Sequence, residues 1–259
     1  MLVHIVSDVH GASEALAQAA QGCDVFVCLG DLILFLDYHD PRQGIFAELF
    51  GEQHARDYIA ARTANRFDEA RDLRTRAWAA IGVTDSETKK MRLEEKVRLQ
   101  YNELFSRMPT PAILTYGNVD VPAMWPEFLR DGHLVADGEA VEIDGQRWGF
   151  VGGGLTSPMR TPYEIDPNDY AAKLSKLGSV DVLFTHIPPS CPFLTYDTIA
   201  RRFEVGSTAI HQYIEEVQPR YHFFGHVHQP LKSRMRIGKT ECVNVGHFHS
   251  RQIPFAVEL

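Results

Sequence analysis

Cysteine is scarce in this sequence, and the few cysteines present are not spaced for chemistry. The four of them, Cys23, Cys28, Cys191 and Cys242, form no Cys-x-x-Cys pair. A thiolate zinc site or a redox pair needs such spacing, and a disulfide scaffold needs a denser set of cysteines. We therefore expect a protein of a reducing compartment whose chemistry does not rest on thiolates.

Long apolar runs and basic blocks are also missing. The sequence opens directly into a strand-like segment, Leu2 to Ser7, without the basic start and apolar core of a signal peptide, and no run is long enough to span a membrane. We expect a cytoplasmic protein with no membrane partner. The formal net charge is -8 at pH 7. Because duplex binding rests on phosphate neutralisation by a basic surface, we do not expect nucleic acid as a partner.

The length and composition favour one catalytic domain over residues 1–259. The chain has 259 residues, of which 44% are hydrophobic, and α/β domains of this size routinely fold as one unit. Residues from about 37 to 108 are charged and helix-forming, which indicates a helical insertion. Thr84-Asp85-Ser86-Glu87 resembles a capping box that begins one of its helices. Apolar residues follow at helical spacing, namely Leu93, Val97, Tyr101, Leu104, Phe105 and Met108.

The sequence leaves the role of this insertion open. Its apolar stripe is typical of core packing. The segment could also form a lid, shape a substrate pocket, or pair two protomers as a homodimer.

The remaining sequence alternates strand-like and helix-like segments early and predicts hairpins late. Ser13 is expected to cap a helix that reaches about Ala20, and Asp144-Gly145 marks a hairpin turn. This pattern is typical of an α/β or α+β fold. Strands are predicted at Leu2 to Ser7, Val25 to Leu29, Ala112 to Tyr116, His133 to Ile143, Arg147 to Val151, Val180 to Thr185, Tyr221 to Phe224, Cys242 to Val245 and Pro254 to Leu259.

Polar side chains that can bind metals follow five of these apolar segments. In open α/β sheets, ligands bind beyond the carboxyl ends of the strands, so five such groups can converge on one site. Carboxylate and amide oxygens mixed with imidazole nitrogens suit Mn, Fe, Zn, Co or Ni. The sequence therefore predicts one metal site. Its groups are Asp8-Val9-His10, Gly30-Asp31, Gly117-Asn118, Thr185-His186 and Gly225-His226-Val227-His228.

In this order, Asp-x-His, Gly-Asp, Gly-Asn-x-Asp, a strand-terminal His and Gly-His-x-His resemble the motifs of the calcineurin-like metallophosphoesterases. The resemblance implies a four-layer sandwich, in which two mixed sheets lie face to face with helices outside. It also implies two divalent metal ions, with manganese favoured and iron, zinc, nickel or cobalt as alternatives. The reaction implied is hydrolysis of a phosphate ester by a hydroxide that bridges the two metals. No nucleophilic side chain is needed for it.

The resemblance also assigns the ligands. It places Asp8, His10, Asp31 and His228 on one ion, and Asn118, His186, His226 and again Asp31 on the other. Asp31 would bridge because a carboxylate has two oxygens and can bond one ion with each.

The sequence departs from the family at one position. Many members read Gly-Asn-His-Asp or Gly-Asn-His-Glu, where the His is thought to protonate the departing oxygen. Here the run is Gly117-Asn118-Val119-Asp120. Valine cannot transfer a proton, and general acid catalysis typically contributes about 10² to 10⁴-fold. Because a stabilised leaving group needs less protonation, this departure favours a small phosphodiester as the substrate.

Other residues could still serve the substrate. His39 is the first candidate for a replacement proton donor, because the loop that contains it leaves the strand before Asp31; His247 and His249 are alternatives. Arg201 or Arg202 could contact a phosphate through its planar guanidinium. Gly206 and Ser207 are expected to cap the helix that follows them.

Three other functions stay open at this point. A monoesterase or a nuclease would use the same metal site. A non-catalytic metal-binding scaffold would keep the fold without the reaction.

Overall fold

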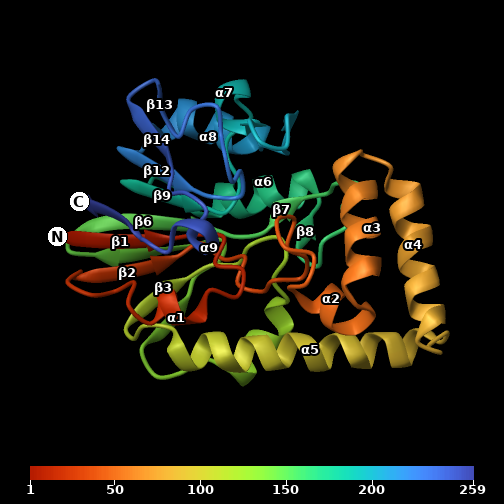
Figure 1. The fold of residues 1–259 in the computed structure, drawn as a ribbon. Coiled ribbons are helices and arrows are strands. Elements are labelled where there is room, and N and C mark those ends of the chain that lie inside the picture. Colours follow the sequence, from red (N-terminus) through yellow and green to blue (C-terminus); the bar gives the residue numbers. More distant parts are fainter. The chain divides into compact units, whose positions relative to one another are not determined.

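In the computed structural model, which describes residues 1–259, the chain divides into two units (Figure 1). The sandwich unit consists of Met1–Leu32 and Leu104–Leu259, and the helical unit consists of Ile33–Glu103. No helix in either unit combines the length and the apolar character that crossing a membrane requires.

The first sheet of the sandwich unit has five strands in the order β15-β1-β2-β3-β4. The pairings of β1 with β2, β2 with β3 and β3 with β4 are parallel, and β15 lies antiparallel to β1. The sheet is therefore mixed. Its strands are β1 (Leu2–Val6), β2 (Val25–Cys28), β3 (Ala112–Leu114), β4 (His133–Val135) and β15 (Phe255–Glu258).

The second sheet has six strands in the order β13-β14-β12-β9-β6-β5. Its central pairings, from β14 to β6, are parallel, and both edge strands pair antiparallel. The strands are β5 (Glu139–Ile143), β6 (Gln146–Val151), β9 (Val182–Thr185), β12 (Tyr221–Phe224), β13 (Arg234–Ile237) and β14 (Thr240–Asn244). Two short pairs complete the unit: β7 (Gly154–Leu155) with β8 (Glu164–Ile165), and β10 (Tyr196–Asp197) with β11 (Arg202–Phe203).

An apolar core lies between the two sheets. Successive strand residues point to opposite faces, so alternate residues of each strand enter this core. Val3 and Ile5 enter it from β1, and Phe184 and Phe223 enter it from β9 and β12. The ring of Phe184 stacks on that of Phe150 with centroids 4.8 Å apart. Face-to-face packing of the sheets follows from this alternation.

Helices cover the outer face of the second sheet. Leu183 and Phe224, the neighbours of the inward-facing phenylalanines, join a separate buried cluster with Leu174 of α6 and Ile214 of α8. On the outer face of the first sheet, His4 Nδ1 lies 2.8 Å from Ala19 O. The helices of this unit are α1 (Ser13–Leu16), a 3₁₀ turn (Pro122–Glu127), α6 (Pro167–Lys176), α7 (Pro192–Thr195), α8 (Thr208–Val217) and α9 (Phe248–Arg251). Two mixed sheets flanked by helices confirm the predicted fold class.

The helical unit has its own apolar cluster. Phe46 stacks on Tyr58 with ring centroids 4.4 Å apart, and Phe50 meets Trp78 edge to face at 4.7 Å. The unit contains α2 (Ile45–Phe50), α3 (Glu52–Thr63), α4 (Phe67–Ala80) and most of α5 (Ser86–Arg107). The predicted apolar stripe continues beyond this unit into the sandwich unit at Leu104. Its residues Val97, Tyr101, Leu104, Phe105 and Met108 are buried, as core packing requires.

Several predicted boundaries were wrong, each for a local reason. The segment from His133 to Ile143 is two strands in different sheets, because Gly138, with φ +74°, turns the chain between them. Ser13 does not cap its helix; it is the first helical residue, and the helix ends at Leu16. The hairpin prediction at Asp144-Gly145 is confirmed, since both residues have positive φ between paired Ile143 and Gln146.

The cap of α5 also differs from the prediction. Asp85, rather than Thr84, accepts the hydrogen bond from Thr88 N at 2.7 Å. A carboxylate three residues before the bonded amide is the usual N-cap arrangement.

We expect Phe184→Ala to destabilise the sandwich unit by about 3–5 kcal/mol, because it leaves a cavity in the core between the sheets. Urea unfolding followed by near-ultraviolet circular dichroism measures the change. Ile253→Ala is the control; its side chain is 73% exposed, so its loss should stay within about 0.5 kcal/mol. Equal losses in the two variants would contradict a close-packed core at Phe184.

Candidate metal centre

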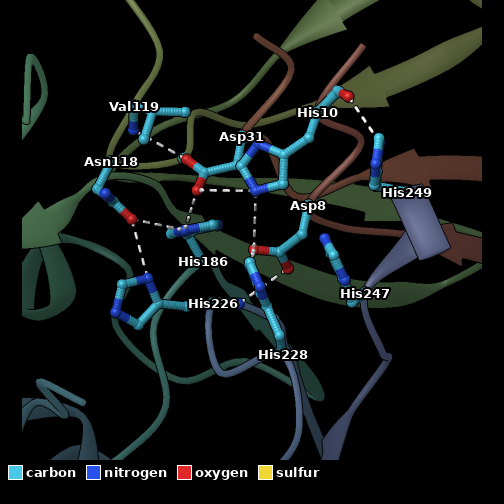
Figure 2. Close-up of polar contacts among 12 residues, drawn as sticks. Asp8, His10, Asp31, Asn118, Val119, His186, His226, His228, His247 and His249 are labelled. Atoms are coloured by element: carbon cyan, nitrogen blue, oxygen red, sulfur yellow. Dashed lines mark hydrogen bonds and ion pairs between the residues drawn. The ribbon is translucent and has the colours of Figure 1, made fainter. Parts of the chain in front are cut away.

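All seven predicted ligands lie together at the carboxyl ends of the parallel strands of the sandwich unit. Figure 2 shows their side chains pointing toward one another. The strands that precede them, β1, β2, β3, β9 and β12, end at Val6, Cys28, Leu114, Thr185 and Phe224. Each of the two packed sheets thus contributes candidate ligands to the same site.

One group of side chains surrounds the carboxylate of Asp8. His228 Nε2 lies 3.4 Å from Asp8 Oδ1, and His10 Nε2 lies 4.0 Å from the same oxygen. His10 Nε2 is also 3.9 Å from Asp31 Oδ2. Asp8 Oδ1 is buried without a hydrogen-bond donor. An oxygen in this position fits a cation, because a buried acceptor without a partner is otherwise costly.

A second group surrounds the amide oxygen of Asn118. This Oδ1 lies 3.0 Å from His186 Nε2 and 2.9 Å from His226 Nδ1. His186 Nε2 is in turn 3.4 Å from Asp31 Oδ2. Asp31 Oδ2 therefore faces both groups. Ligand atoms bound about 2.0–2.2 Å from one ion lie roughly 3–3.5 Å apart, so this spacing fits a shared metal.

The hydrogen bonds of His186 indicate that a positive charge belongs here. Its Nδ1 lies 3.0 Å from Leu29 O, which can only accept, so Nδ1 carries a proton. The other nitrogen, Nε2, then faces two more acceptors, Asn118 Oδ1 and Asp31 Oδ2. A metal ion or a second proton satisfies this arrangement. Without a metal, burial acts to lower the pKa of His186, but the carboxylate of Asp31 outweighs it and raises the pKa to about 9.

The same field acts on Asp8 and His228. Burial acts to raise the pKa of Asp8, but the nearby imidazole of His228, with His186 and His10, outweighs burial and holds the pKa well below its usual range. Burial likewise acts to lower the pKa of His228, and Asp8 raises it. The carboxylate of Asp8 is thus held ionised, which favours binding of a cation.

The backbone around the ligands is held in an unusual conformation. Asp8, His10, Asp31 and His226 have φ values of +57°, +40°, +55° and +65°. This left-handed region is uncommon for residues other than glycine and clusters at functional sites. Backbone hydrogen bonds fix it: Asp8 N donates to Gly30 O at 3.0 Å, and His10 N donates to Asp31 O at 2.9 Å.

Two glycines allow the loops after β2 and β3 to meet. A Cβ on Gly30 would overlap the backbone N of Gly117, and a Cβ on Gly117 would overlap the carboxylate of Asp31. A side chain at either position would separate the loops. The Gly-Asp and Gly-Asn motifs are therefore two sides of one close contact.

Asp120 supports this contact, a role that was not predicted from the sequence. Its carboxylate accepts hydrogen bonds from Asp31 N at 2.8 Å, Leu32 N at 3.0 Å and Gly117 N at 2.8 Å. Burial, followed by the charge of Asp31, raises its pKa to about 7. Its place as the last residue of the Gly-Asn-x-Asp motif was the signal that could have identified it.

Val119 occupies the third position of the Gly-Asn-x-Asp motif, where the family resemblance implies a proton-donating histidine. Its backbone N donates to Asp31 Oδ1 at 2.9 Å, while the side chain has nothing to donate (Figure 2). Asp31 Oδ1 is thus engaged by the backbone, and Oδ2 faces the two groups of ligands.

The alternative histidines of the segment after β14 lie beside the first group. His247 is buried, its ring stacks on that of His228 with centroids 3.8 Å apart, and it forms a possible three-histidine ligand group with His10 and His228. His249 Nδ1 lies 2.8 Å from His10 O. The structure brings both residues to the candidate centre; their role as proton donors stays a prediction.

The remaining candidates are exposed or already paired. His39 is an exposed residue of the helical unit. Arg201 is exposed, and Arg202 pairs with Glu204 through Nε and Oε1 at 2.7 Å. The substrate roles of all three stay predictions. Ser207 is confirmed as the cap of α8, accepting from Ile210 N at 3.2 Å.

Comparisons with known proteins agree with this geometry. One solved structure is similar over 95% of this chain and 91% of its own, with 15% identity and a TM-score of 0.57. The crystal structure of TT1561 of Thermus thermophilus is similar over 99% of this chain and 98% of its own, with 12% identity and a TM-score of 0.50. At these identities the likeness shows the fold. None of the curated proteins matches the sequence.

The sequence itself matches a family model. The model for calcineurin-like phosphoesterases matches residues 1–230, which include all seven predicted ligands. The chain therefore belongs to the calcineurin-like phosphoesterase family, whose members are metal-dependent phosphoesterases.

Proposed function

We propose that the protein is a dinuclear metal phosphodiesterase that acts on a small phosphodiester. The observation that carries the proposal is the position of Asp31 Oδ2 between two groups of ligand atoms, 3.9 Å from His10 Nε2 and 3.4 Å from His186 Nε2. Bound ions would supply Lewis-acid stabilisation of the phosphoryl oxygens and lower the pKa of a water near the ester.

The ligands would divide between the ions as the family resemblance implies. Asp8, His10 and His228 would hold one ion, and Asn118, His186 and His226 would hold the other. Asp31 belongs to both, and its Oδ2 is the atom best placed to be shared, since Oδ1 accepts from Val119 N at 2.9 Å. Mn²⁺ is the ion we favour, as the family resemblance implies, although iron, zinc, nickel and cobalt also suit mixed carboxylate, amide and imidazole ligands.

The preference for a diester rests on Val119. With no proton donor at this position, the departing oxygen leaves with less protonation, so esters with a stable leaving anion should react best. The net charge of -8 disfavours a long polyanion such as duplex nucleic acid and favours a small substrate.

The side chains of the site would act mainly by position. His186 is oriented by its bond to Leu29 O, and Asp31 is oriented by Asp120 and Val119 through the backbone. Because these contacts are in place before a substrate binds, little reorganisation is needed during the reaction.

We expect Asp31→Asn to reduce the metal content of the protein from two Mn²⁺ ions to fewer than one, because both sites lose the shared carboxylate oxygen. Mass spectrometry of metals in protein reconstituted with Mn²⁺ after chelator treatment measures the stoichiometry. Asp144→Asn, at the exposed hairpin turn, is the matched control and should keep both ions. Fewer than two ions per chain in the unaltered protein would contradict the dinuclear assignment.

We expect Asn118→Ala to reduce turnover of a chromogenic phosphodiester by roughly 100-fold or more, since even residues that only orient metal ligands contribute 10–100-fold. The assay compares the diester with its monoester at saturating Mn²⁺. Diester turnover that survives in this variant would contradict the site. Silence of the unaltered protein toward both esters would favour the scaffold function instead, and a monoester preference would make His39 the next residue to change.

We expect Val119→His to raise the ratio of monoester to diester turnover by about 10-fold or more, because it restores a proton donor beside the departing oxygen. Val121→His, two residues further along the same loop, is the control for an added imidazole. Steady-state kinetics on both esters gives the ratio. An unchanged ratio in Val119→His would show that proton donation at this position does not set the preference.

A further inference from the structure

The orientation of the Asn118 amide decides whether it can bind a cation. Only its oxygen can bind a metal, whereas the NH₂ group would present hydrogens to it. Oδ1 faces His186 and His226, and Nδ2 lies on the other side, 3.0 Å from Thr161 Oγ1. Thr161 therefore contacts the half of the amide that must stay away from the ion.

The direction of this hydrogen bond is fixed by Glu164. Its Oε1 accepts from Thr161 N at 2.9 Å and from Thr161 Oγ1 at 3.0 Å. The same carboxylate accepts from Ser157 N at 2.8 Å and from Ser157 Oγ at 2.6 Å. Since the hydroxyl proton of Thr161 goes to Glu164, the Thr161 oxygen is left to accept, and Nδ2 of Asn118 must be the donor. A flipped amide would lose this bond.

The backbone holds the same segment against Asn118. Tyr163 N donates to Asn118 O at 2.9 Å. The short strands β7 and β8 close the loop between them, and a Cβ on Gly154 would lie 2.7 Å from Asn118 Cβ. The loop between β7 and β8 thus packs on Asn118 by main chain as well as side chain, which keeps Thr161 within bonding distance.

We propose that Thr161, oriented by Glu164, is a positioning residue for the second metal site. It holds the Asn118 amide with Oδ1 toward the ion shared with His186 and His226. This inference rests on the proposed function, in which Asn118 is a metal ligand. Residues that orient metal ligands through hydrogen bonds typically contribute 10–100-fold to metal affinity.

The test is calorimetric titration of metal-free protein with Mn²⁺, which resolves the two ions. Thr161→Val keeps the shape of the side chain and removes the hydroxyl. We expect it to lower the affinity for the second ion by about 10–100-fold and to leave the affinity for the first ion unchanged, because Asn118 belongs to the second site alone. Thr161→Ser restores the hydroxyl and should return the second affinity toward that of the unaltered protein.

Thr156→Val is the matched control. It makes the same change in the same loop, where the Thr156 hydroxyl reaches only the carbonyl of Ile165 at 3.5 Å. Both affinities should stay as in the unaltered protein. The first ion serves as an internal control for folding in every variant.

The outcomes separate this inference from the proposed function. If the unaltered protein binds two ions and Thr161→Val binds both with the same affinities as the unaltered protein, the role of Thr161 is overturned and the dinuclear site stands. Equal weakening in Thr156→Val, or loss of both ions in Thr161→Val, would also overturn it, since the effect would then be general to the loop. A protein that binds fewer than two ions would remove the proposed function and this inference with it.

Discussion

The structure of the site depends on several hydrogen-bond acceptors that are buried close together. Asn118 Oδ1 and Asp31 Oδ2 lie 3.0 and 3.4 Å from His186 Nε2, and Asp8 Oδ1 and Asp31 Oδ2 lie 4.0 and 3.9 Å from His10 Nε2. None of these oxygens can donate a hydrogen bond. Burial of such acceptors together is unfavourable unless a cation joins them. The raised pKa of His186 and the lowered pKa of Asp8 express the same requirement when only protons are available.

The surrounding fold holds these atoms together against their mutual repulsion. Parallel strands of two sheets end at one edge, and the close contact of Gly30 with Gly117 brings the loops after β2 and β3 together. Asp120 then bonds the amides of both loops, so that Asp31 is positioned by backbone as well as by side chain. The left-handed backbone conformation of the site residues costs free energy. It persists because hydrogen bonds and the packed sandwich hold it in place.

Local sequence patterns predicted most of the strands but not the way they combine. The strands β9 and β12 give nearly continuous apolar runs, because almost every residue in them is buried. The strand from Arg234 to Ile237 was missed because it is an edge strand with arginines on its exposed face. The segment from His133 to Ile143 reads as one continuous strand, and only its pairing partners show that it belongs to two sheets.

The sequence by itself determined the family, the fold class and the seven candidate ligands, because each ligand stands in a short motif directly after an apolar strand. Only the tertiary structure decided which oxygen of Asp31 faces both groups, that Asp120 joins the loops, and that His247 lies beside His228. The same holds for Thr161 and Glu164, which lie in no motif, and Thr161 meets Asn118 across 43 positions of sequence. A motif predicts the residues that contact a ligand, whereas the residues that orient them are selected by distance in the folded chain, which a single sequence does not reveal.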